Sequence, residues 1–286
     1  TMALNPGAKS AAALFARLRG ASPFFLISGP SALESLEHAL FMSDALASLS
    51  VRTGIPVVYK TSFDKANGTL AVSPRGLGLD ASLRAFEEIK RASGLPVITD
   101  VHECWQVGPV AEVVDVLQIL AFLCRQTDLL VAAAQSGLPV NVKKGQFASA
   151  GVMGHAADKP RQAGGEHVML TERGTTFVYD DLVVDCRNLE LMREAAPDAL
   201  IVMDATHAVQ SPPSSAGTGT TGGGRRFVPT IARMAAAVGV DGFFLETHDR
   251  PEQALSDAAV QLPFEQLEPL VLELAAIGRA SNGGRR

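Results

Sequence analysis

Short apolar runs alternate with longer amphipathic segments along almost the whole chain. Helical periodicity is clear in SLRAFEEIKRASG and FVPTIARMAAAVG, which both end in glycine, a common residue after the last turn of a helix. Runs without polar alternation are typical of parallel strands that are buried on both faces. Eight such runs cover residues 24–30, 56–62, 96–102, 116–122, 139–145, 167–174, 199–207 and 242–248.

Eight strand–helix units in 286 residues predict an α/β fold, a single (β/α)8 TIM barrel. A doubly wound sheet would use about five to seven of these units and leave the others over, so the barrel is the favoured interpretation. We expect an N-terminal extension over residues 1–20, with a short surface helix near residues 11–19. Residues 21–286 would then form the catalytic barrel domain.

Polar residues gather at the C-terminal ends of the eight runs. A barrel brings these ends together on one rim, which is the rim where barrel enzymes carry their active sites. The set comprises Lys60, Asp100, His102, Gln118, Lys143, Lys144, Glu172, Arg173, Asp204, His207, Glu246 and His248. The sequence therefore predicts an active site built from most of the strands.

The composition is that of a soluble globular enzyme, with 47% hydrophobic and 19% charged residues. A net charge of −5 argues against nucleic-acid and anionic-membrane partners. Cations nevertheless converge on the predicted rim, where they would attract compact polyanions such as phosphorylated carboxylates or sugar phosphates. They are Lys60, Lys65, Arg125, Lys143, Lys144 and Arg173. Because neighbours on a strand alternate faces, one of the two adjacent lysines must point out of the barrel.

Further groups leave alternatives open. His207, Glu246, His248 and Asp257, with His102 nearby, would form either a divalent metal site or a hydrogen-bonded polar network. Cys124 is either a thiolate nucleophile beside a cation or, as we favour, a buried apolar residue.

Two other features concern the cell compartment and a loop. Three cysteines without CxxC spacing predict a reducing cytosol. The low-complexity tract Ser211–Gly224 is either a flexible insertion or a mobile lid over the rim.

Several motifs occur in order between about residues 27 and 269, among them YKTSFDKAN, ITDVHE, AFLCRQTDLL, VNVKKGQF, DATHAVQ and GFFLETH. With these motifs the chain resembles the 3-deoxy-D-manno-octulosonate 8-phosphate synthases, also called 2-dehydro-3-deoxyphosphooctonate aldolases. The resemblance implies a transferase that condenses phosphoenolpyruvate with D-arabinose 5-phosphate and water, and releases phosphate. It also implies a cytoplasmic homotetramer that serves lipopolysaccharide biosynthesis.

The resemblance further implies roles for individual residues. Four cations would hold phosphoenolpyruvate, and a histidine would position water or carry a proton at the reacting carbons. The catalytic residues would be Lys60, Lys65, Lys143, His207 and Asp257. The residues that bind the two substrates would be Asn67, Thr69, Asp100, Gln118, Ala121, Phe122, Arg125 and Arg173.

The chain departs from the family pattern in GPSALES, where metal-requiring members have a cysteine and this chain has Ser31. The metal set would be Ser31, His207, Glu246 and Asp257. A serine hydroxyl is a poorer ligand than a thiolate for a borderline metal, so we expect no required cofactor and at most an optional divalent metal.

A second departure is KANGTL, where Gly68 stands in place of the arginine that would hold the sugar phosphate. A lost charge-assisted contact to phosphate costs about 1.5–3 kcal/mol. Two alternatives to the synthase therefore remain. One is a paralogue that condenses phosphoenolpyruvate with another aldose or aldose phosphate, and the other is a barrel that binds phosphate esters without turnover.

Overall fold

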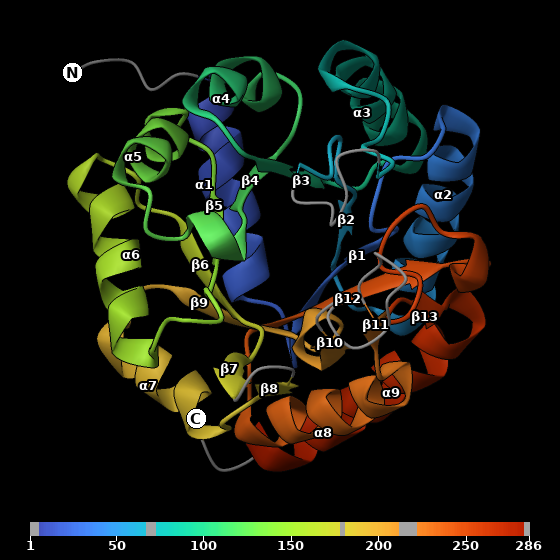
Figure 1. The fold of residues 1–286 in the computed structure, drawn as a ribbon, viewed down its shortest axis with the longest axis vertical. Helices are drawn as coiled ribbons and strands as arrows, with labels where there is room; N and C mark the ends of the chain where they lie inside the picture. Colours follow the sequence, from blue (N-terminus) through green and yellow to red (C-terminus); the bar gives the residue numbers. More distant parts are fainter. Residues whose placement is uncertain (1–5, 67–72, 178–180, 212–221, 283–286) are drawn as a thin grey trace.

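A computed structural model describes residues 6–66, 73–177, 181–211 and 222–282 (Figure 1). Within these residues each barrel strand pairs in parallel with the next, and the last pairs with the first, which closes the barrel. The strands are β1 (Phe25–Gly29), β2 (Val57–Lys60), β3 (Val97–Val101), β4 (Val116–Ile119), β5 (Val140–Lys143), β6 (Val168–Glu172), β9 (Leu200–Asp204) and β12 (Gly242–His248). The predicted (β/α)8 barrel is confirmed.

Helices surround this ring of strands and bury its outer face (Figure 1). They are α2 (Leu36–Thr53), α3 (Leu79–Ser93), α4 (Cys104–Ala111), α5 (Thr127–Gln135), α6 (Ala150–Gln162), α7 (Arg187–Ala195), α8 (Val228–Val238) and α9 (Phe264–Asn282). Ser35 caps α2 by accepting a hydrogen bond from the backbone N–H of His38, and Gly54 ends the helix with a left-handed φ of 71°. Among the described residues, every helix is too short or too polar to cross a membrane.

Short elements follow the strands at their C-terminal ends. They are η1 (Ala121–Leu123), β7 (Thr175–Phe177), β8 (Asp181–Val183), η2 (His207–Val209), β10 (Gln210–Ser211), β11 (Gly222–Gly223), η4 (Arg225–Phe227), η5 (Pro251–Gln253) and β13 (Leu262–Pro263). β10 and β11 pair antiparallel at the two ends of the glycine-rich tract. Residues 212–221 of that tract lie outside the described residues, so the choice between insertion and lid stays open.

The N-terminal helix α1 (Pro6–Arg19) covers the predicted residues 11–19, but one face of it is buried, which the sequence analysis did not predict. Phe15 and Leu18 are only 4% and 1% exposed, and they pack with Phe25, Val116 and other residues near the N-terminal ends of the strands. Figure 1 shows α1, in dark blue, lying across the ring of strands. α1 therefore closes the end of the barrel opposite the rim, and its apolar stripe was too Ala-rich to reveal this.

Replacing Phe15 with alanine should lower the free energy of unfolding by about 3 kcal/mol, because a buried aromatic ring is lost from the barrel floor. The ring stacks on His167 with centroids 4.8 Å apart. Urea unfolding followed by circular dichroism measures the change. The matched control is Phe41→Ala on α2, where the side chain is 56% exposed and the expected change is below about 0.5 kcal/mol. Equal losses in the two variants would contradict a packed floor.

Candidate active site

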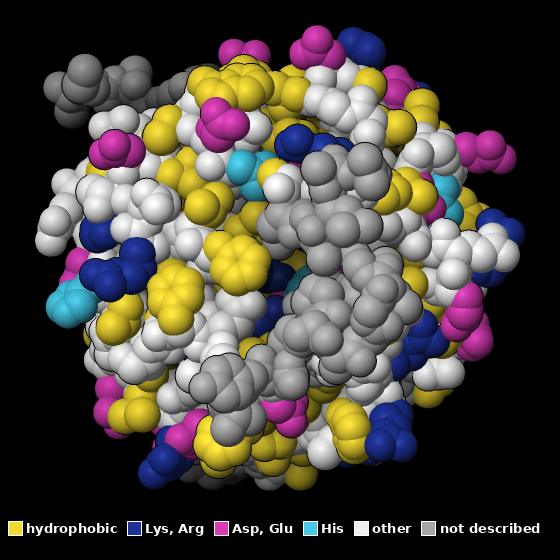
Figure 2. All heavy atoms as spheres, viewed as in Figure 1, with side chains coloured by type: hydrophobic (Ala, Val, Ile, Leu, Met, Phe, Trp, Pro, Cys, Tyr) yellow, Lys and Arg dark blue, Asp and Glu magenta, His cyan; other side chains and the backbone are white. Residues whose placement is uncertain are grey.

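The face of the molecule that carries the C-terminal ends of the strands is hollowed at its centre (Figure 2). Lys and Arg side chains, in dark blue, are visible inside the hollow, and hydrophobic side chains border it (Figure 2).

Gly29 helps to build this rim at the end of β1. A Cβ added there would lie 2.1 Å from the Lys60 carbonyl oxygen, so the exit of β1 needs glycine at its φ of 154°.

Two lysines lie buried at the ends of β2 and β5, each against a carboxylate from a different strand. Lys60 Nζ donates to Glu246 Oε1 at 2.7 Å and to the Ser31 carbonyl at 3.2 Å. Lys143 Nζ donates to Asp204 Oδ2 at 2.5 Å. The exposed fractions of Lys60 and Lys143 are 2% and 4%. Their ammonium groups are therefore held in a dry environment by single carboxylate partners.

The two lysines differ in how firmly they hold their protons. Burial lowers the pKa of Lys143, and the nearby ammonium of Lys60 adds to this, so Asp204 only partly compensates. Burial alone would also lower the pKa of Lys60, but the carboxylates of Glu246 and Asp100 outweigh it and raise that pKa. Lys60 is thus a fixed positive charge, whereas Lys143 is the better proton donor.

Asp204 also orients His207. Its Oδ2 lies 2.8 Å from His207 Nδ1, and its Oδ1 accepts the His207 backbone N–H at 2.8 Å. The interactions with His207 and the ammonium group of Lys143 overcome the effect of burial and hold the pKa of Asp204 well below its usual range, so it is ionised. A carboxylate at Nδ1 places the imidazole proton there. The lone pair on Nε2 then faces the site.

Asp257 completes this side of the site from the loop before β13. Its φ of 54° is left-handed, which is rare for a residue other than glycine and points to a functional constraint. Three side chains hold the carboxylate: Ser31 Oγ donates at 2.6 Å, Ser256 Oγ at 3.0 Å and Gln210 Nε2 at 2.6 Å. Lys65 Nζ lies 3.7 Å away and, with His207, overcomes the effect of burial and lowers the pKa of Asp257.

A ladder of buried polar side chains crosses the barrel from β3 to β6. Gln118 Nε2 donates to Asp100 Oδ1 at 3.0 Å, and Asn141 Nδ2 donates to Gln118 Oε1 at 3.0 Å. Thr171 Oγ1 donates to Asn141 Oδ1 at 2.6 Å, which ends the chain of hydrogen bonds. Asn141 and Thr171 were given no role from the sequence, and Asp204 was placed on the predicted rim without an individual role. Asn141 and Thr171 each interrupt an apolar run, and that interruption was the signal available.

The predicted metal set is partly assembled. His207 Nε2 lies 3.7 Å from Glu246 Oε2 and 3.9 Å from Asp257 Oδ2, and Glu246 Oε2 is buried with no hydrogen-bond partner among the described residues. These three residues could hold a divalent cation. Ser31 Oγ donates its proton to Asp257, and a neutral hydroxyl is a poorer metal ligand than a thiolate. Lys60 and Lys65 also lie beside the two carboxylates and compete with a cation for them.

Arg173 and Lys144 diverge at the rim. One terminal nitrogen of Arg173 donates to Gln210 Oε1 at 2.6 Å, whereas Nη1 is buried, has no hydrogen-bond partner among the described residues and can bind an anion. Lys144 is fully buried and donates to the carbonyl oxygen of Gly174 at 2.9 Å and to Thr175 Oγ1 at 3.0 Å. The expectation that only one of the adjacent lysines faces the lumen is confirmed, and Lys143 is that residue.

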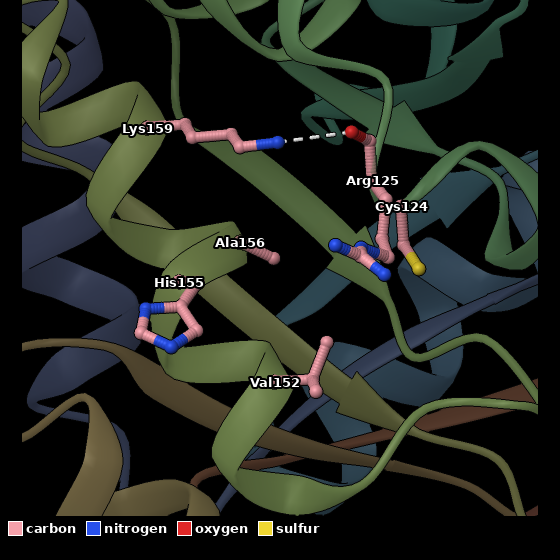
Figure 3. Close-up of a pocket in the computed structure, with 6 residues that line it drawn as sticks. All are labelled: Cys124, Arg125, Val152, His155, Ala156 and Lys159. Carbon is pink, nitrogen blue, oxygen red and sulfur yellow. Dashed lines mark hydrogen bonds between the residues drawn. The ribbon is translucent and has the colours of Figure 1, made fainter.

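Arg125 is not brought to the lysines. It lines a separate pocket of about 240 Å³ between η1 and α6, in which Lys159 Nζ donates to the Arg125 carbonyl at 2.9 Å (Figure 3). The adjoining Cys124 is buried, and burial raises the pKa of its thiol. This favours the interpretation of Cys124 as an apolar residue rather than a nucleophile.

The remaining predicted residues have separate locations. Ala121 is 9% exposed and Phe122 is 55% exposed, both on η1. His102 Nε2 lies 3.7 Å from Asp100 Oδ2. His248 does not join His207 but contacts Glu34 and Asp249 instead. Asn67, Gly68 and Thr69 lie outside the described residues.

With this geometry established, comparison with known proteins identifies the family. The model of the DAHP synthetase I family matches residues 17–278. The chain belongs to this family. It is 50% identical over 279 residues to 2-dehydro-3-deoxyphosphooctonate aldolase 2 of Arabidopsis thaliana, across 96% of this chain and 95% of that protein.

Relatives from a bacterium and from a second plant are equally similar. The 2-dehydro-3-deoxyphosphooctonate aldolase of Rhodopseudomonas palustris strain BisB5 is 52% identical over 253 residues, which cover 88% of this chain and 87% of that protein. The aldolase of the same name from Pisum sativum is 50% identical over 273 residues, covering 94% and 93% of the two chains. The similarity therefore extends over nearly the full length of each relative.

Replacing Asp204 with asparagine should lower kcat by about 1,000-fold, because His207 loses the carboxylate that fixes its tautomer. Lys143 also loses its counter-charge, which lowers its pKa further. The alkaline limb of the pH profile should therefore move to lower pH. Steady-state assays across pH measure both effects. Asp185→Asn removes only an exposed ion pair with Arg187 and serves as the control. A fall in kcat with an unmoved alkaline limb would contradict this role for Asp204.

Proposed function

We propose that the protein condenses phosphoenolpyruvate with D-arabinose 5-phosphate and water, giving 3-deoxy-D-manno-octulosonate 8-phosphate and phosphate. The observation that carries this proposal is the buried pair of lysines, Lys60 and Lys143, which face a lumen that also receives Asp100, Gln118 and His207. Relatives at about half identity bear the name of this activity over almost their whole length. Fixed donors of this kind suit a substrate that carries both a carboxylate and a phosphate.

The reaction forms a carbon–carbon bond and breaks a bond to phosphate. C3 of phosphoenolpyruvate attacks the aldehyde carbon of the sugar, and water adds at C2. The tetrahedral intermediate then loses inorganic phosphate, which leaves a ketone at C2. Negative charge moves toward the departing phosphate, so cations that are already in place stabilise the transition state more than the ground state.

The described side chains divide this work. Lys60, with its raised pKa, stays charged and holds an anionic group of phosphoenolpyruvate, and Arg173 Nη1 offers a second donor. Lys143, with its lowered pKa, can give a proton to the sugar oxygen as the carbon–carbon bond forms. His207 Nε2, held by Asp204, takes a proton from the water that attacks C2. Phe244, whose ring centre is 3.4 Å from Lys143 Nζ, helps to keep bulk water away.

We propose that turnover requires no metal. This rests on Ser31, whose neutral hydroxyl is a weak metal ligand and donates its proton to Asp257. It also rests on the ammonium groups of Lys60 and Lys65, which balance the carboxylates of Glu246 and Asp257. Asp257 then positions the neighbouring polar groups rather than a cation. A divalent ion at His207, Glu246 and Asp257 would be optional.

We also propose that the protein works as a homotetramer in the cytoplasm, in lipopolysaccharide biosynthesis. Large hydrophobic side chains support an association of chains, since Phe122, Phe147 and Phe177 are 55%, 61% and 62% exposed on or next to the rim. The three cysteines are free, which suits a reducing compartment.

The choice of aldehyde is tested with purified protein, phosphoenolpyruvate and a panel of aldoses and aldose phosphates, by following phosphate release. We expect turnover with D-arabinose 5-phosphate, and a Gly68→Arg variant should lower its KM by about 10- to 100-fold by restoring a charged contact. Unphosphorylated arabinose is the control, because its KM should not change. Turnover only with another aldose would instead favour the paralogue, and phosphoenolpyruvate binding without turnover would favour the non-catalytic barrel.

Chelation tests the metal proposal. The wild-type protein should keep its full kcat in excess EDTA, because no step depends on a bound cation. A Ser31→Cys variant places a thiolate beside His207, Glu246 and Asp257, and its activity should become sensitive to EDTA and respond to added divalent metal. Loss of wild-type activity in EDTA, with recovery on adding metal, would overturn the proposal.

A further inference from the structure

A second group of metal-binding side chains lies outside the lumen, at the closure between the first and last strands of the barrel. Glu34 comes from the loop after β1, His38 from the first turns of α2, and His248 from the end of β12. One ligand atom from each of the three lies within 4.8 Å of the others. The exposed fractions of these side chains are 18%, 14% and 3%. The group is therefore largely shielded but reachable from solvent.

Asp249 touches both histidines of this group. Its Oδ1 lies 2.9 Å from His38 Nε2 and 3.0 Å from His248 Nδ1, and the two imidazole rings lie with centroids 4.4 Å apart. When Asp249 Oδ1 accepts a proton from each ring, the other nitrogen of each ring carries a free lone pair and can bind a metal ion. Those nitrogens, His38 Nδ1 and His248 Nε2, are buried and have no hydrogen-bond partner among the described residues.

His248 Nε2 and Glu34 Oε1 lie 3.3 Å apart, which is an ion-pair contact when the imidazole is protonated. Two ligand atoms bound to one zinc ion at about 2.0–2.2 Å, with a tetrahedral angle between them, lie about 3.3 Å apart. Glu34 Oε1 is fixed because it accepts the Leu255 backbone N–H at 2.9 Å. The spacing of two ligands of one metal ion is therefore present between a buried imidazole nitrogen and a fixed carboxylate oxygen.

One contact competes with a metal. The Arg250 backbone N–H donates to His248 Nδ1 at 2.9 Å, which places the ring proton on Nε2 when no ion is bound. A cation at Nε2 would move that proton to Nδ1, where Asp249 Oδ1 accepts it. The proton stays on the ring, but the hydrogen bond from Arg250 is lost. The loss of this hydrogen bond lowers the affinity of the site for the cation but does not prevent the cation from binding.

We propose that Glu34, His38 and His248 bind a divalent cation of zinc type, with Asp249 as the carboxylate that orients both imidazoles. Two imidazoles and a carboxylate, with water in the fourth position, are a common ligand set for zinc. At His207, Glu246 and Asp257, by contrast, lysine ammonium groups lie beside both carboxylates and compete with a cation for them. The inference does not depend on the proposed function.

Bound metal would join three segments that are far apart in sequence. β1 and β12 close the barrel by pairing from Phe25 with Gly242 to Gly29 with Glu246. The ion would extend that closure beyond the last backbone pair and tie α2 to it. Its role would thus be structural, since no described lumen side chain is among its ligands.

Zinc titration of metal-free protein tests the proposal. Calorimetry and differential scanning fluorimetry with zinc alone should show binding and a rise in Tm of a few degrees. His38→Gln should weaken the binding about 100-fold and remove the rise in Tm, while turnover stays unchanged. Asp257→Asn, which damages the lumen cluster only, should keep the zinc binding and the rise in Tm. Glu34→Gln is a second variant, and circular dichroism verifies the fold of each protein.

The outcomes separate the two clusters. Zinc binding that survives in His38→Gln and Glu34→Gln but disappears in Asp257→Asn would assign the ion to the lumen and overturn the proposal. Absence of zinc binding by the folded wild-type protein would overturn it as well. Because turnover is measured separately, a protein without synthase activity but with the expected zinc response would still support the site.

Discussion

An ammonium group buried in a protein interior must have a carboxylate within hydrogen-bond distance, because breaking such a pair costs about 3–5 kcal/mol. Lys60 and Lys143 impose this condition on the barrel. Glu246 has to stand on β12 and Asp204 on β9, and both are fully buried. The same two carboxylates lie beside His207. The ion pairs that offset the cost of burying the two lysines therefore also position the histidine. Charge compensation and catalytic geometry are one arrangement.

The arrangement is less cationic than the rim suggested from the sequence. Lys144 and Arg125 do not face the lumen, and the cations that do are matched by acidic side chains. The facing cations are Lys60, Lys65, Lys143 and Arg173, and the acidic side chains are Asp100, Asp204, Glu246 and Asp257. Binding of an anion in the lumen depends on preorganised hydrogen-bond donors, such as Arg173 Nη1, more than on the net charge of the lumen.

The sequence predicted the barrel and the lysines well because both follow from position along a strand. Unbroken apolar runs mark strands with two buried faces, and their C-terminal ends define the rim. Alternation also predicted that Lys143 and Lys144 face opposite sides. Directions in the loops and at the last residue of a strand were not predictable, because the conformation of the following loop sets them. Arg125 lines a pocket against α6, and His248, the last residue of β12, lies with Glu34 and His38.

The floor formed by α1 determines how small molecules enter and leave the barrel. Phe15 and Leu18 close the lower end of the barrel together with Phe25 and other apolar side chains, and Figure 1 shows the helix across it. Among the described residues the lumen is thus a blind tube with its mouth at the rim. Whatever enters must leave by the same mouth. Substrates and products therefore share a single path, and a bound molecule that fills the mouth also blocks the exit of anything below it.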